Sequence, residues 1–250
     1  MENNCKLINI HSHILPQIDD GAKDIDMAIE MLKESYSQGV DNVILSYHFH
    51  PDHSEQKEKA LSQLHLLESR MEETSTGQVP HMYLGSEILY DSNSISYIKS
   101  GQAFTLANSK YVLIEFLPSD SFGKITSAIL EFKLNNYRPI IAHAERYECL
   151  SEISNVKKIV DSGGYIQINA RNFLTNKWNL SEKKRKKRLI RMLQMGLVHF
   201  IADDCHDIQD RGPCLGHAFN QLRDEGQLDE ELLNRVFIKN QQKILDDEKI

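Results

Sequence analysis

The sequence has few of the residues that build disulfide frameworks, membrane spans or nucleic-acid surfaces. Its 250 residues include four cysteines, which are scattered and form no CxxC pair. This usage argues against a disulfide framework and fits reduced thiols in a cytosol. No apolar run is long enough to cross a bilayer, and the net charge of −7 argues against a general nucleic-acid binder. The N-terminus lacks the basic and apolar regions of a signal peptide, so we expect a cytoplasmic protein.

The apolar residues form short runs that alternate with helical stretches. The runs predict seven strands, within residues 7–10, 43–46, 82–84, 112–116, 139–142, 165–168 and 198–202. Apolar residues at helical spacing predict helices within 25–36, 61–71, 153–160, 181–196 and 228–245. This alternation indicates right-handed βαβ units and a parallel sheet, and hence a (β/α) barrel with one unit short or distorted. No repeat or linker interrupts the pattern, which favours a single domain over residues 1–250.

Two of the predicted helices carry signals at their ends. Asp24 stands where the cap of the first helix is expected, and Gly39 is placed to end that helix. Ser181 is predicted to cap the helix that ends at Gly196. These signals locate the first helix between the first two strands.

Side chains that bind metal ions follow almost every predicted strand. The first run ends in His11 and His13, which point to the same side of an extended chain. The other runs end at or near His48, Glu87, Glu115, His143 and the group Asp203, Asp204 and His206, whereas the sixth carries only Gln167 and Asn169. Reactive side chains gather at the carboxyl ends of the strands in parallel barrels, so we expect these residues to meet on one rim. Imidazoles together with carboxylates suit Mn²⁺, Zn²⁺ or iron.

A single histidine at a strand end is more often a hydrogen-bonded structural residue than a metal ligand. The coincidence of such residues at six strand ends is what predicts a metal centre. The remaining histidines are interpreted as surface or loop residues, with His50 as the leading exception: His50, His53, His65, His81, His199 and His217.

Several motifs, in this order along nearly the whole chain, resemble a known family. They are "INIHSHILPQIDDGAKD", "YLGSEI", "YVLIEF", "IAHAERY", "IQINA" and "ADDCHD". The chain resembles the PHP (polymerase and histidinol phosphatase) superfamily. More narrowly, it is similar to bacterial manganese-dependent protein-tyrosine phosphatases of capsule and exopolysaccharide synthesis. The resemblance implies a distorted TIM-like (β/α)7 barrel and a site with three divalent ions, Mn²⁺ first and Fe or Zn as alternatives.

The resemblance also implies a role for each matching residue. One metal would be held by His11, His13, Glu87 and Asp204, and Glu87 would bridge to a second metal with Glu115 and His143. Asp20, His48 and His206 would hold the third metal, and Arg146 and Arg211 would grip the phosphate. The implied substrate is phosphotyrosine on a protein, with the tyrosine-rich tail of a cognate bacterial kinase as the expected partner. The motif "YHFH" and Asp203 depart from the usual pattern of the family.

Three other functions compete with this interpretation. A histidinol-phosphate phosphatase, or another small phosphomonoester phosphatase of the superfamily, would use the same metal ligands. An inactive metal-binding regulator of a kinase would keep the ligands without turnover. Cys205 to Arg211 match the Cx5R spacing of thiol phosphatases, but Asp207 and Asp210 would repel phosphate and raise the pKa of the thiol.

One basic segment stands out in this acidic protein. Residues 183–191 read "KKRKKRLIR" within a predicted helix. A solvated helix face is the ordinary interpretation of such a charge run, and a docking patch for an acidic or multiply phosphorylated tail is the alternative. The sequence leaves this choice and the oligomeric state open.

Overall fold

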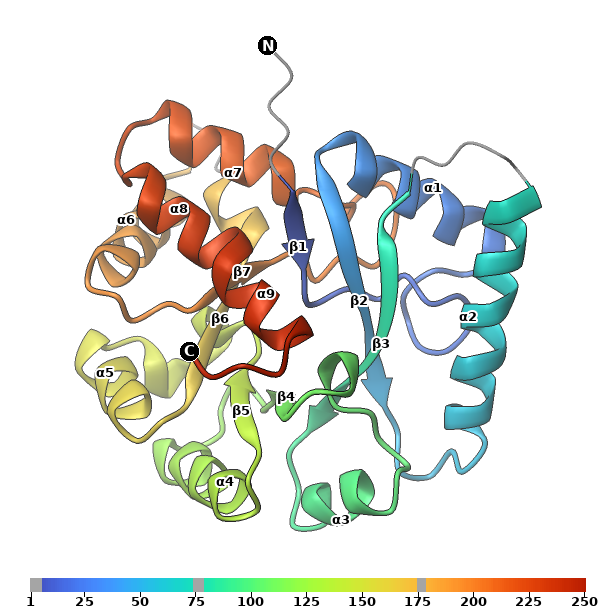
Figure 1. The fold of residues 1–250 in the computed structure, drawn as a ribbon. Coiled ribbons are helices and arrows are strands. Elements are labelled where there is room, and N and C mark those ends of the chain that lie inside the picture. Colours follow the sequence, from blue (N-terminus) through green and yellow to red (C-terminus); the bar gives the residue numbers. More distant parts are fainter. Residues whose placement is uncertain (1–5, 74–78, 175–178) are drawn as a thin grey trace.

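The computed structural model describes residues 6–73, 79–174 and 179–250, and its centre is a barrel of parallel strands. The strands pair in chain order, β1 to β7, and helices surround them (Figure 1). They are β1 (Leu7–Asn9), β2 (Val40–Phe49), β3 (His81–Leu89), β4 (Tyr111–Glu115), β5 (Arg138–Ile141), β6 (Tyr165–Asn169) and β7 (Phe200–Ala202). The predicted (β/α)7 barrel is therefore confirmed, although β2 and β3 are longer than expected.

The barrel closes where the first and last strands meet. The Asp204 N–H donates to the His11 carbonyl and the His13 N–H donates to the Cys205 carbonyl, both at 2.9 Å. These bonds lie beyond the ends of β1 and β7, around a single parallel bridge between Ser12 and Cys205. The closure is short and lies at the carboxyl end, which makes the barrel distorted.

The Asn9 side chain strengthens this closure from within the barrel wall. Its Nδ2 donates to Asp203 Oδ2, and its Oδ1 accepts from the Asp203 N–H, both at 3.1 Å. Asp203 Oδ1 also accepts from the Cys214 N–H at 2.9 Å. Burial raises the pKa of the Asp203 carboxyl to about 6. Asp203 thus holds the two ends of the sheet together.

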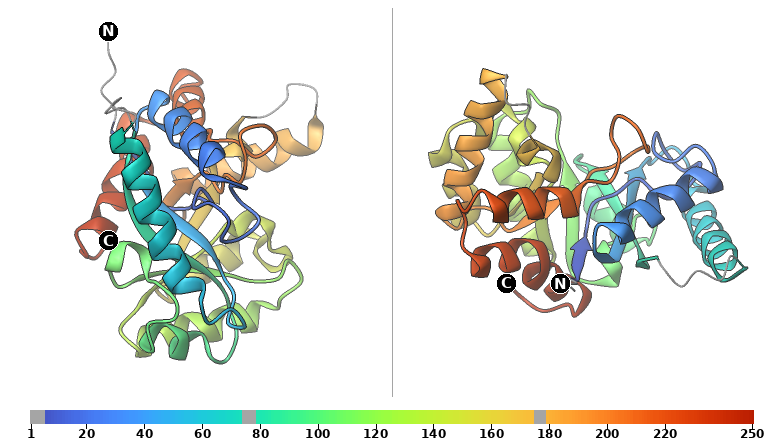
Figure 2. Two further views of the ribbon diagram at one scale, coloured as in Figure 1. Left: turned by 90° about the vertical axis from the view of Figure 1, so that its right-hand side faces the viewer. Right: turned by 90° about the horizontal axis from the view of Figure 1, so that it is seen from above.

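The helices form a layer outside the strands, as the further views also show (Figure 2). They are α1 (Ile25–Ser37), α2 (Gln56–Glu73), α3 (Ser94–Lys99), α4 (Phe122–Leu134), α5 (Ile153–Asp161), α6 (Leu180–Gln194), α7 (Leu215–Asp224), α8 (Glu230–Asn234) and α9 (Asn240–Leu245). A π-helical turn, Arg235–Lys239, joins the last two. Among the described residues, no helix is both long and apolar enough to cross a membrane.

Two predicted helix ends are confirmed and one predicted cap is wrong. Asp24 caps α1 by accepting from the Met27 N–H at 2.9 Å, and Gly39 follows that helix with a left-handed φ of 87°. The cap of α6 is Asn179, not Ser181, because the Asn179 side chain accepts from the N–H groups of Ser181 and Glu182. Asparagine caps helices as well as serine does, and Ser181 lies inside the first turn.

On β2 and β4, the side chains that share the face of the candidate ligands change from apolar to polar along the strand. On β4 the alternate residues Tyr111, Leu113 and Glu115 run from the amino end to the carboxyl end. On β2, Ile44 is followed at the same spacing by Ser46 and His48. Because alternate residues share one face of a strand, this alternation brings His48 and Glu115 to the carboxyl rim.

The amino end of the barrel is filled with aromatic rings and covered by the end of the chain. Tyr111, Tyr165 and Phe200 start their strands, and the rings of Tyr111 and Tyr165 lie 5.5 Å apart between centroids. The Tyr111 hydroxyl donates to the Glu248 carbonyl at 2.8 Å. His199 lies here too, and its Nδ1 accepts from the Ile166 N–H at 3.1 Å. This end of the barrel is therefore structural.

Candidate metal centre

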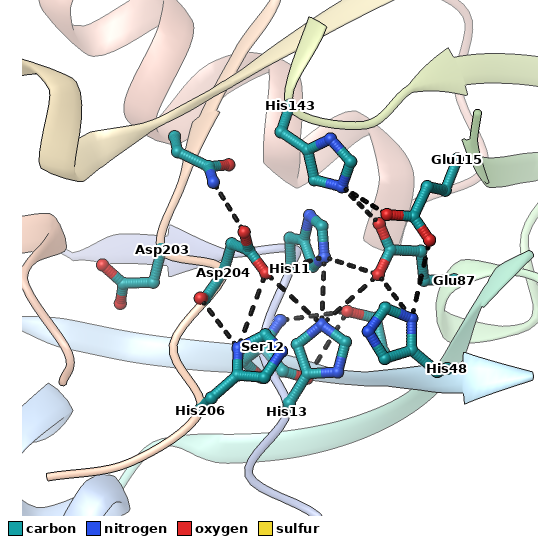
Figure 3. A network of polar contacts seen from close by, with 12 residues as sticks. His11, Ser12, His13, His48, Glu87, Glu115, His143, Asp203, Asp204 and His206 are labelled. Atoms are coloured by element: carbon teal, nitrogen blue, oxygen red, sulfur yellow. Dashed lines mark hydrogen bonds and ion pairs between the residues drawn. The ribbon is translucent and has the colours of Figure 1, made fainter. Parts of the chain in front are cut away.

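The histidines after β1 face the aspartate after β7 (Figure 3). His11 Nε2 and His13 Nε2 lie 3.6 and 3.5 Å from Asp204 Oδ1. The two Nε2 atoms lie only 3.2 Å from each other. All three side chains are buried. The closure between β1 and β7 therefore brings three candidate ligands, nearly 200 residues apart in sequence, to one point.

Glu87 occupies the middle of the cluster. Its Oε2 lies 3.1 Å from His48 Nδ1, 3.2 Å from His11 Nε2 and 3.4 Å from His13 Nε2. Its Oε1 lies 2.9 Å from His143 Nε2. A carboxylate with different histidines on its two oxygens has the arrangement of a bridging ligand.

Glu115 and Asp20 complete the rim on its two sides. Glu115 Oε1 lies 3.3 Å from His143 Nε2, and Glu115 Oε2 lies 3.8 Å from His48 Nδ1. Asp20 Oδ1 lies 3.5 Å from both His48 Nε2 and His206 Nε2. All nine predicted ligands thus lie in one cluster, with Asp20 the most exposed at 64% of its side chain.

The loop that carries Asp20 depends on Gly21. The Ala22 N–H donates to the His13 carbonyl at 3.0 Å, so the loop folds back onto the strand end. A Cβ on Gly21 would lie 2.0 Å from the His13 carbonyl oxygen, which leaves room only for glycine. The "DDG" sequence therefore places Asp20 over the cluster and Asp19 behind His13 by a close backbone approach.

Asp19, which the sequence analysis did not single out, holds His13 from behind. Its Oδ2 accepts from His13 Nδ1 at 2.7 Å and from the His48 N–H at 2.8 Å. Its Oδ1 accepts from the Gly21 N–H at 3.0 Å. The adjacent aspartates therefore have different roles, because Asp20 faces the cluster and Asp19 orients His13. The "DD" pair was the available signal, but it did not say which carboxylate turns inward.

Gln167 fixes the ring of His11 in the same way. Its Oε1 accepts from the His143 N–H at 2.6 Å and lies 3.2 Å from His11 Nδ1. Because this oxygen only accepts, the proton of His11 is on Nδ1 and the lone pair of Nε2 faces the cluster. His206 follows the pattern, with Nδ1 3.0 Å from the Asp204 carbonyl. Outer partners of this kind fix the tautomer and orientation of metal-binding histidines.

The sixth strand thus contributes orienting side chains in place of ligands. The Gln167 amide donates to Asn169 Oδ1 at 2.9 Å, and the Asn169 amide donates to Asp204 Oδ2 at 2.6 Å. On the other side of the cluster, the Tyr147 hydroxyl lies 3.3 Å from His143 Nδ1 and accepts from the Phe116 N–H. The sequence shows Gln167, Asn169 and Tyr147 as polar residues, but it does not show which groups they contact.

The pKa shifts in the cluster show that its carboxylates are stabilised by positive charge. Burial disfavours the charged form of His13, but hydrogen bonds to Asp19, Asp204 and Glu87 outweigh it and raise its pKa well above 6.5. Burial likewise opposes the charged form of His143, yet its hydrogen bonds to nearby glutamates raise its pKa to about 9. Burial also opposes the charged carboxylates, but His11 and its neighbours hold the pKa of Glu87 and Asp204 well below the usual values. The carboxylates need protons or other cations beside them.

The donor set fits divalent metal ions. Glu87 Oε2 and His206 Nε2 are buried without a hydrogen-bond partner. His11 Nε2 and His13 Nε2 lie 3.2 Å apart beside the carboxylates, an arrangement that suits a divalent ion between nitrogen and oxygen ligands. Three overlapping groups of converging ligand atoms occur in the described chain: His13, Asp20, His48 and His206; His11, His13 and Asp204; His48, Glu87 and Glu115.

Two of the candidate ligands have a left-handed backbone. His143 has φ 30° and Asp204 has φ 54°, a region that residues other than glycine rarely adopt. Both residues lie two positions after the end of a strand, where such a turn aims the side chain back over the barrel. Strained backbone of this kind concentrates at functional sites.

Arg146 and Arg211 lie at the edge of the cluster on the Asp204 side. Arg146 Nη2 pairs with Asp204 Oδ2, and Arg211 Nη2 lies 3.2 Å from Asp204 Oδ1. Their side chains are 41% and 39% exposed, so part of each guanidinium faces solvent. A guanidinium has five N–H donors, and both arginines therefore keep donors for an anion above the cluster.

The thiol alternative does not fit the site. Cys205 is 1% exposed, and burial raises its pKa well above 9. The neighbouring charges of Asp203 and Asp204 act in the same direction. Reactive cysteines need an electropositive, accessible setting, which Cys205 lacks.

The histidines interpreted as surface or loop residues are mostly exposed. His50, His53, His65, His81 and His217 face solvent, whereas His199 is partly buried at the amino end of the barrel. His50 lines the hollow beside His48, with its ring centroid 6.4 Å from that of His48. His50 is thus the histidine of this group that borders the cluster.

Comparison with known proteins identifies the family. Residues 7–246 match the family model described as "Capsular polysaccharide synthesis, CpsB/CapC". The chain belongs to the CpsB/CapC family. Curated relatives include the tyrosine-protein phosphatase CpsB of Streptococcus agalactiae, 34% identical over 96% of this chain and 98% of the relative. The putative tyrosine-protein phosphatase CapC of Staphylococcus aureus is 31% identical over 98% and 93%.

Solved structures agree with membership of the CpsB/CapC family. A structure from the work on YwqE of Bacillus subtilis and CpsB of Streptococcus pneumoniae, described as metal-dependent tyrosine phosphatases, matches with a TM-score of 0.84 and 27% identity. It covers 98% of this chain and 96% of that chain. A dihydropyrimidinase from Brevibacillus agri has a TM-score of 0.61 at 11% identity over 96% and 70%, a likeness of fold alone. The CpsB/CapC fold of this chain is thus a variant of a widely used barrel.

Proposed function

We propose that this chain is a metal-dependent protein-tyrosine phosphatase. The observation that carries the proposal is the cluster of histidines and carboxylates on one rim, bordered by Arg146 and Arg211. Phosphatase names among the relatives in the CpsB/CapC family support it. No observation specifically favours the alternatives, which are a histidinol-phosphate or other small phosphomonoester phosphatase and an inactive metal-binding regulator of a kinase.

The proposed ligand groups follow the contacts of the cluster. His11, His13, Glu87 and Asp204 would hold one ion, and Glu87, Glu115 and His143 a second. Asp20, His48 and His206 would hold a third ion near the rim. Manganese is the ion that we propose, because the resemblance to manganese-dependent phosphatases implies it; iron and zinc are the alternatives, since they share these ligands.

The residues around the cluster account for the chemistry of phosphate ester hydrolysis. When bound, divalent ions supply Lewis acidity towards phosphoryl oxygens and lower the pKa of water towards neutrality. Arg146 and Arg211 would bind the phosphate oxygens by charge-assisted hydrogen bonds and so fix the orientation of the ester. Asp204 would hold both guanidinium groups in place through its two oxygens.

The reaction breaks the bond between phosphorus and the tyrosyl oxygen, and the oxygen of a water molecule replaces it on phosphorus. The electron pair of the broken bond leaves on a phenolate, which is more stable than an alkoxide. An aryl ester therefore needs less help from a general acid than an alkyl ester does. The proton that the attacking water loses ends on the phenolate oxygen, directly or through solvent, so that inorganic phosphate and tyrosine are the products.

The proposal extends to the setting of the reaction. The substrate would be a phosphotyrosine-bearing protein, and a cognate bacterial tyrosine kinase is the candidate, which the capsule-synthesis family supports. Cys149, Cys205 and Cys214 are free thiols, as suits the cytoplasm. We propose that the chain acts there as a single catalytic domain.

Stripping the protein of metal and titrating Mn²⁺ back tests the proposal. Hydrolysis of a phosphotyrosyl peptide should be absent in the stripped protein and return with Mn²⁺, in the wild type and in Cys205→Ser alike. Activity that survives stripping, or that is lost in a folded Cys205→Ser variant, would reject the metal mechanism. If histidinol phosphate is hydrolysed and the peptide is not, the substrate assignment is wrong.

A further inference from the structure

A hollow of about 350 Å³ opens on the Glu115 side of the cluster, opposite the two arginines. Three candidate ligands, His48, Glu87 and Glu115, form one of its walls. Its other walls are mainly apolar, and we call it the aryl pocket, defined by Phe49, Leu89, Tyr90 and Tyr97. The pocket is therefore continuous with the site where the phosphate ester would react.

The apolar walls are unusual beside so many charged groups. Leu89, the last residue of β3, follows Glu87 by two positions and is 47% exposed. The Phe49 ring packs against the Tyr97 ring with centroids 5.1 Å apart. An exposed apolar patch next to a polar site is typical of a ligand-binding surface. The last residues of β2 and β3 thus supply two candidate ligands, His48 and Glu87, and an apolar surface beside them.

The polar groups of the two tyrosines are used elsewhere. The Tyr90 hydroxyl donates to Glu131 Oε2 at 2.7 Å, and the Tyr97 hydroxyl donates to Asp91 Oδ2 at 3.2 Å. Asp91, which also lines the pocket, accepts through Oδ1 from the Asn93 N–H and the Ser94 hydroxyl. What the tyrosines offer to the pocket is ring carbon, which suits an apolar occupant.

The size and position of the pocket fit a phenyl ring. A cavity of about 150 Å³ is enough to hold benzene, so about 350 Å³ holds a tyrosyl ring with room for its approach. In phosphotyrosine the ring is joined to phosphorus through one oxygen. A phosphate held between the cluster and the arginines can therefore place the ring against Leu89 and Phe49. The hollow on the arginine side is lined by Arg146, Arg171 and Arg185, which suit charged groups.

We propose that the aryl pocket binds the phenyl ring of the phosphotyrosyl side chain and selects aryl over alkyl phosphate monoesters. This inference rests on the proposed function and names the residues that determine its substrate class. A phosphoserine would bring a peptide backbone to the same place, where its polar groups would lose water without finding partners. Leu89 and Tyr97 are specificity-determining residues in this account, and neither is a candidate metal ligand.

The test compares the binding of two phosphonates that cannot be hydrolysed. Benzylphosphonate carries a ring and methylphosphonate does not, so the ratio of their dissociation constants reports the ring alone. Calorimetry on the Mn²⁺-loaded protein should show tighter binding of benzylphosphonate. Leu89→Ala should reduce this preference about fivefold and Leu89→Asn about tenfold, since both remove apolar contact from the ring. Binding of methylphosphonate should not change.

Leu134→Ala is the matched control, because Leu134 is a 74% exposed leucine on α4 and lines no part of the aryl pocket. It should leave both dissociation constants unchanged. An unchanged preference in the Leu89 variants, or an equal loss for both phosphonates, would overturn the inference. A wild type that hydrolyses phosphotyrosyl peptide but shows no preference leaves the proposed function intact and rejects the pocket. Selective binding without turnover rejects the proposed function and supports the pocket.

Discussion

The two ends of the barrel use the same residue types for opposite purposes. At the carboxyl end, His13 and His143 are surrounded by carboxylates that raise the pKa of both imidazoles. At the amino end, His199 lies against the Tyr165 ring, and burial, helped by Arg235, lowers its pKa to about 4. A histidine is a candidate ligand or a neutral structural acceptor according to the charges that surround it.

The largest expected effect separates the two ends by activity. Glu87→Gln removes the charge from the carboxylate at the centre of the cluster, so kcat/KM for a phosphotyrosyl peptide should fall roughly a thousandfold. His199→Gln at the amino end should stay within about twofold of the wild type, because its ring makes only structural contacts. Near-normal activity in Glu87→Gln, with the fold intact by circular dichroism, would show that the cluster is not the catalyst.

A smaller effect is expected from the outer partner of His13. Asp19→Asn keeps an acceptor for His13 Nδ1 but removes its charge, so the affinity for Mn²⁺ should fall about 10–100-fold. Titration of the stripped protein with Mn²⁺ measures the change. Asp161→Asn, an exposed aspartate at the end of α5, is the matched control and should bind as the wild type does. Equal Mn²⁺ affinities for Asp19→Asn and the wild type would show that Asp19 stabilises only the loop and does not support His13 as a ligand.

The carboxyl end should also control stability at alkaline pH. In the stripped protein the folded-state pKa of His143 is about 9, above its unfolded value, so the folded state binds more protons between pH 6.5 and 9. The stabilisation is complete below pH 6.5 and is lost as the pH rises, by roughly 2–4 kcal/mol in the free energy of unfolding. Urea denaturation at pH 6.5, 7.5 and 9 measures it. With Mn²⁺ the trend should reverse, because protons compete with the metal for the same nitrogens. A flat profile in the stripped protein would contradict the raised pKa.

The amino end should show the opposite dependence, at acid pH. The folded-state pKa of His199 is about 4, below its unfolded value, so the unfolded state binds more protons between pH 6.5 and 4. Its contribution is present above pH 6.5 and is lost as the pH falls, by roughly 2–4 kcal/mol. His199→Gln keeps an acceptor for the Ile166 N–H and cannot titrate. The variant should therefore lose less stability than the wild type over this range, and identical losses would contradict the shift.

The sequence predicted the barrel and the ligand rim because both depend on short-range patterns. Six of the seven apolar runs have a candidate ligand at or near their carboxyl ends, and the carboxyl ends of parallel strands meet on one rim. Asp24 was correctly predicted as a cap because its signal is local. Near the start of α6 two polar residues can both act as a cap, and the structure has Asn179 in that position and Ser181 inside the helix.

The features that were not predicted depend on contacts between distant segments. Asp19 turns inward because Gly21 packs on the His13 carbonyl, and Gln167 orients His11 from 156 residues away. The aryl pocket joins Leu89 to Tyr97 across a loop and a short helix that the apolar pattern did not reveal. Such partners follow from the assembled barrel, which fixes them only after the strands have paired.

The closure between β1 and β7 has a consequence for the nascent chain during translation. Asn9 and Asp203 meet across 194 positions of sequence, and Asp204 joins His11 at the same place. His11 and His13 leave the ribosome first, but their carboxylate partner and Arg211 are made nearly two hundred residues later. A translation product that stops before the last strand therefore has seven of the nine candidate ligands and Arg146, but it lacks Asp204, His206 and Arg211. Dephosphorylation begins only after the last strand has been synthesised and has found the first.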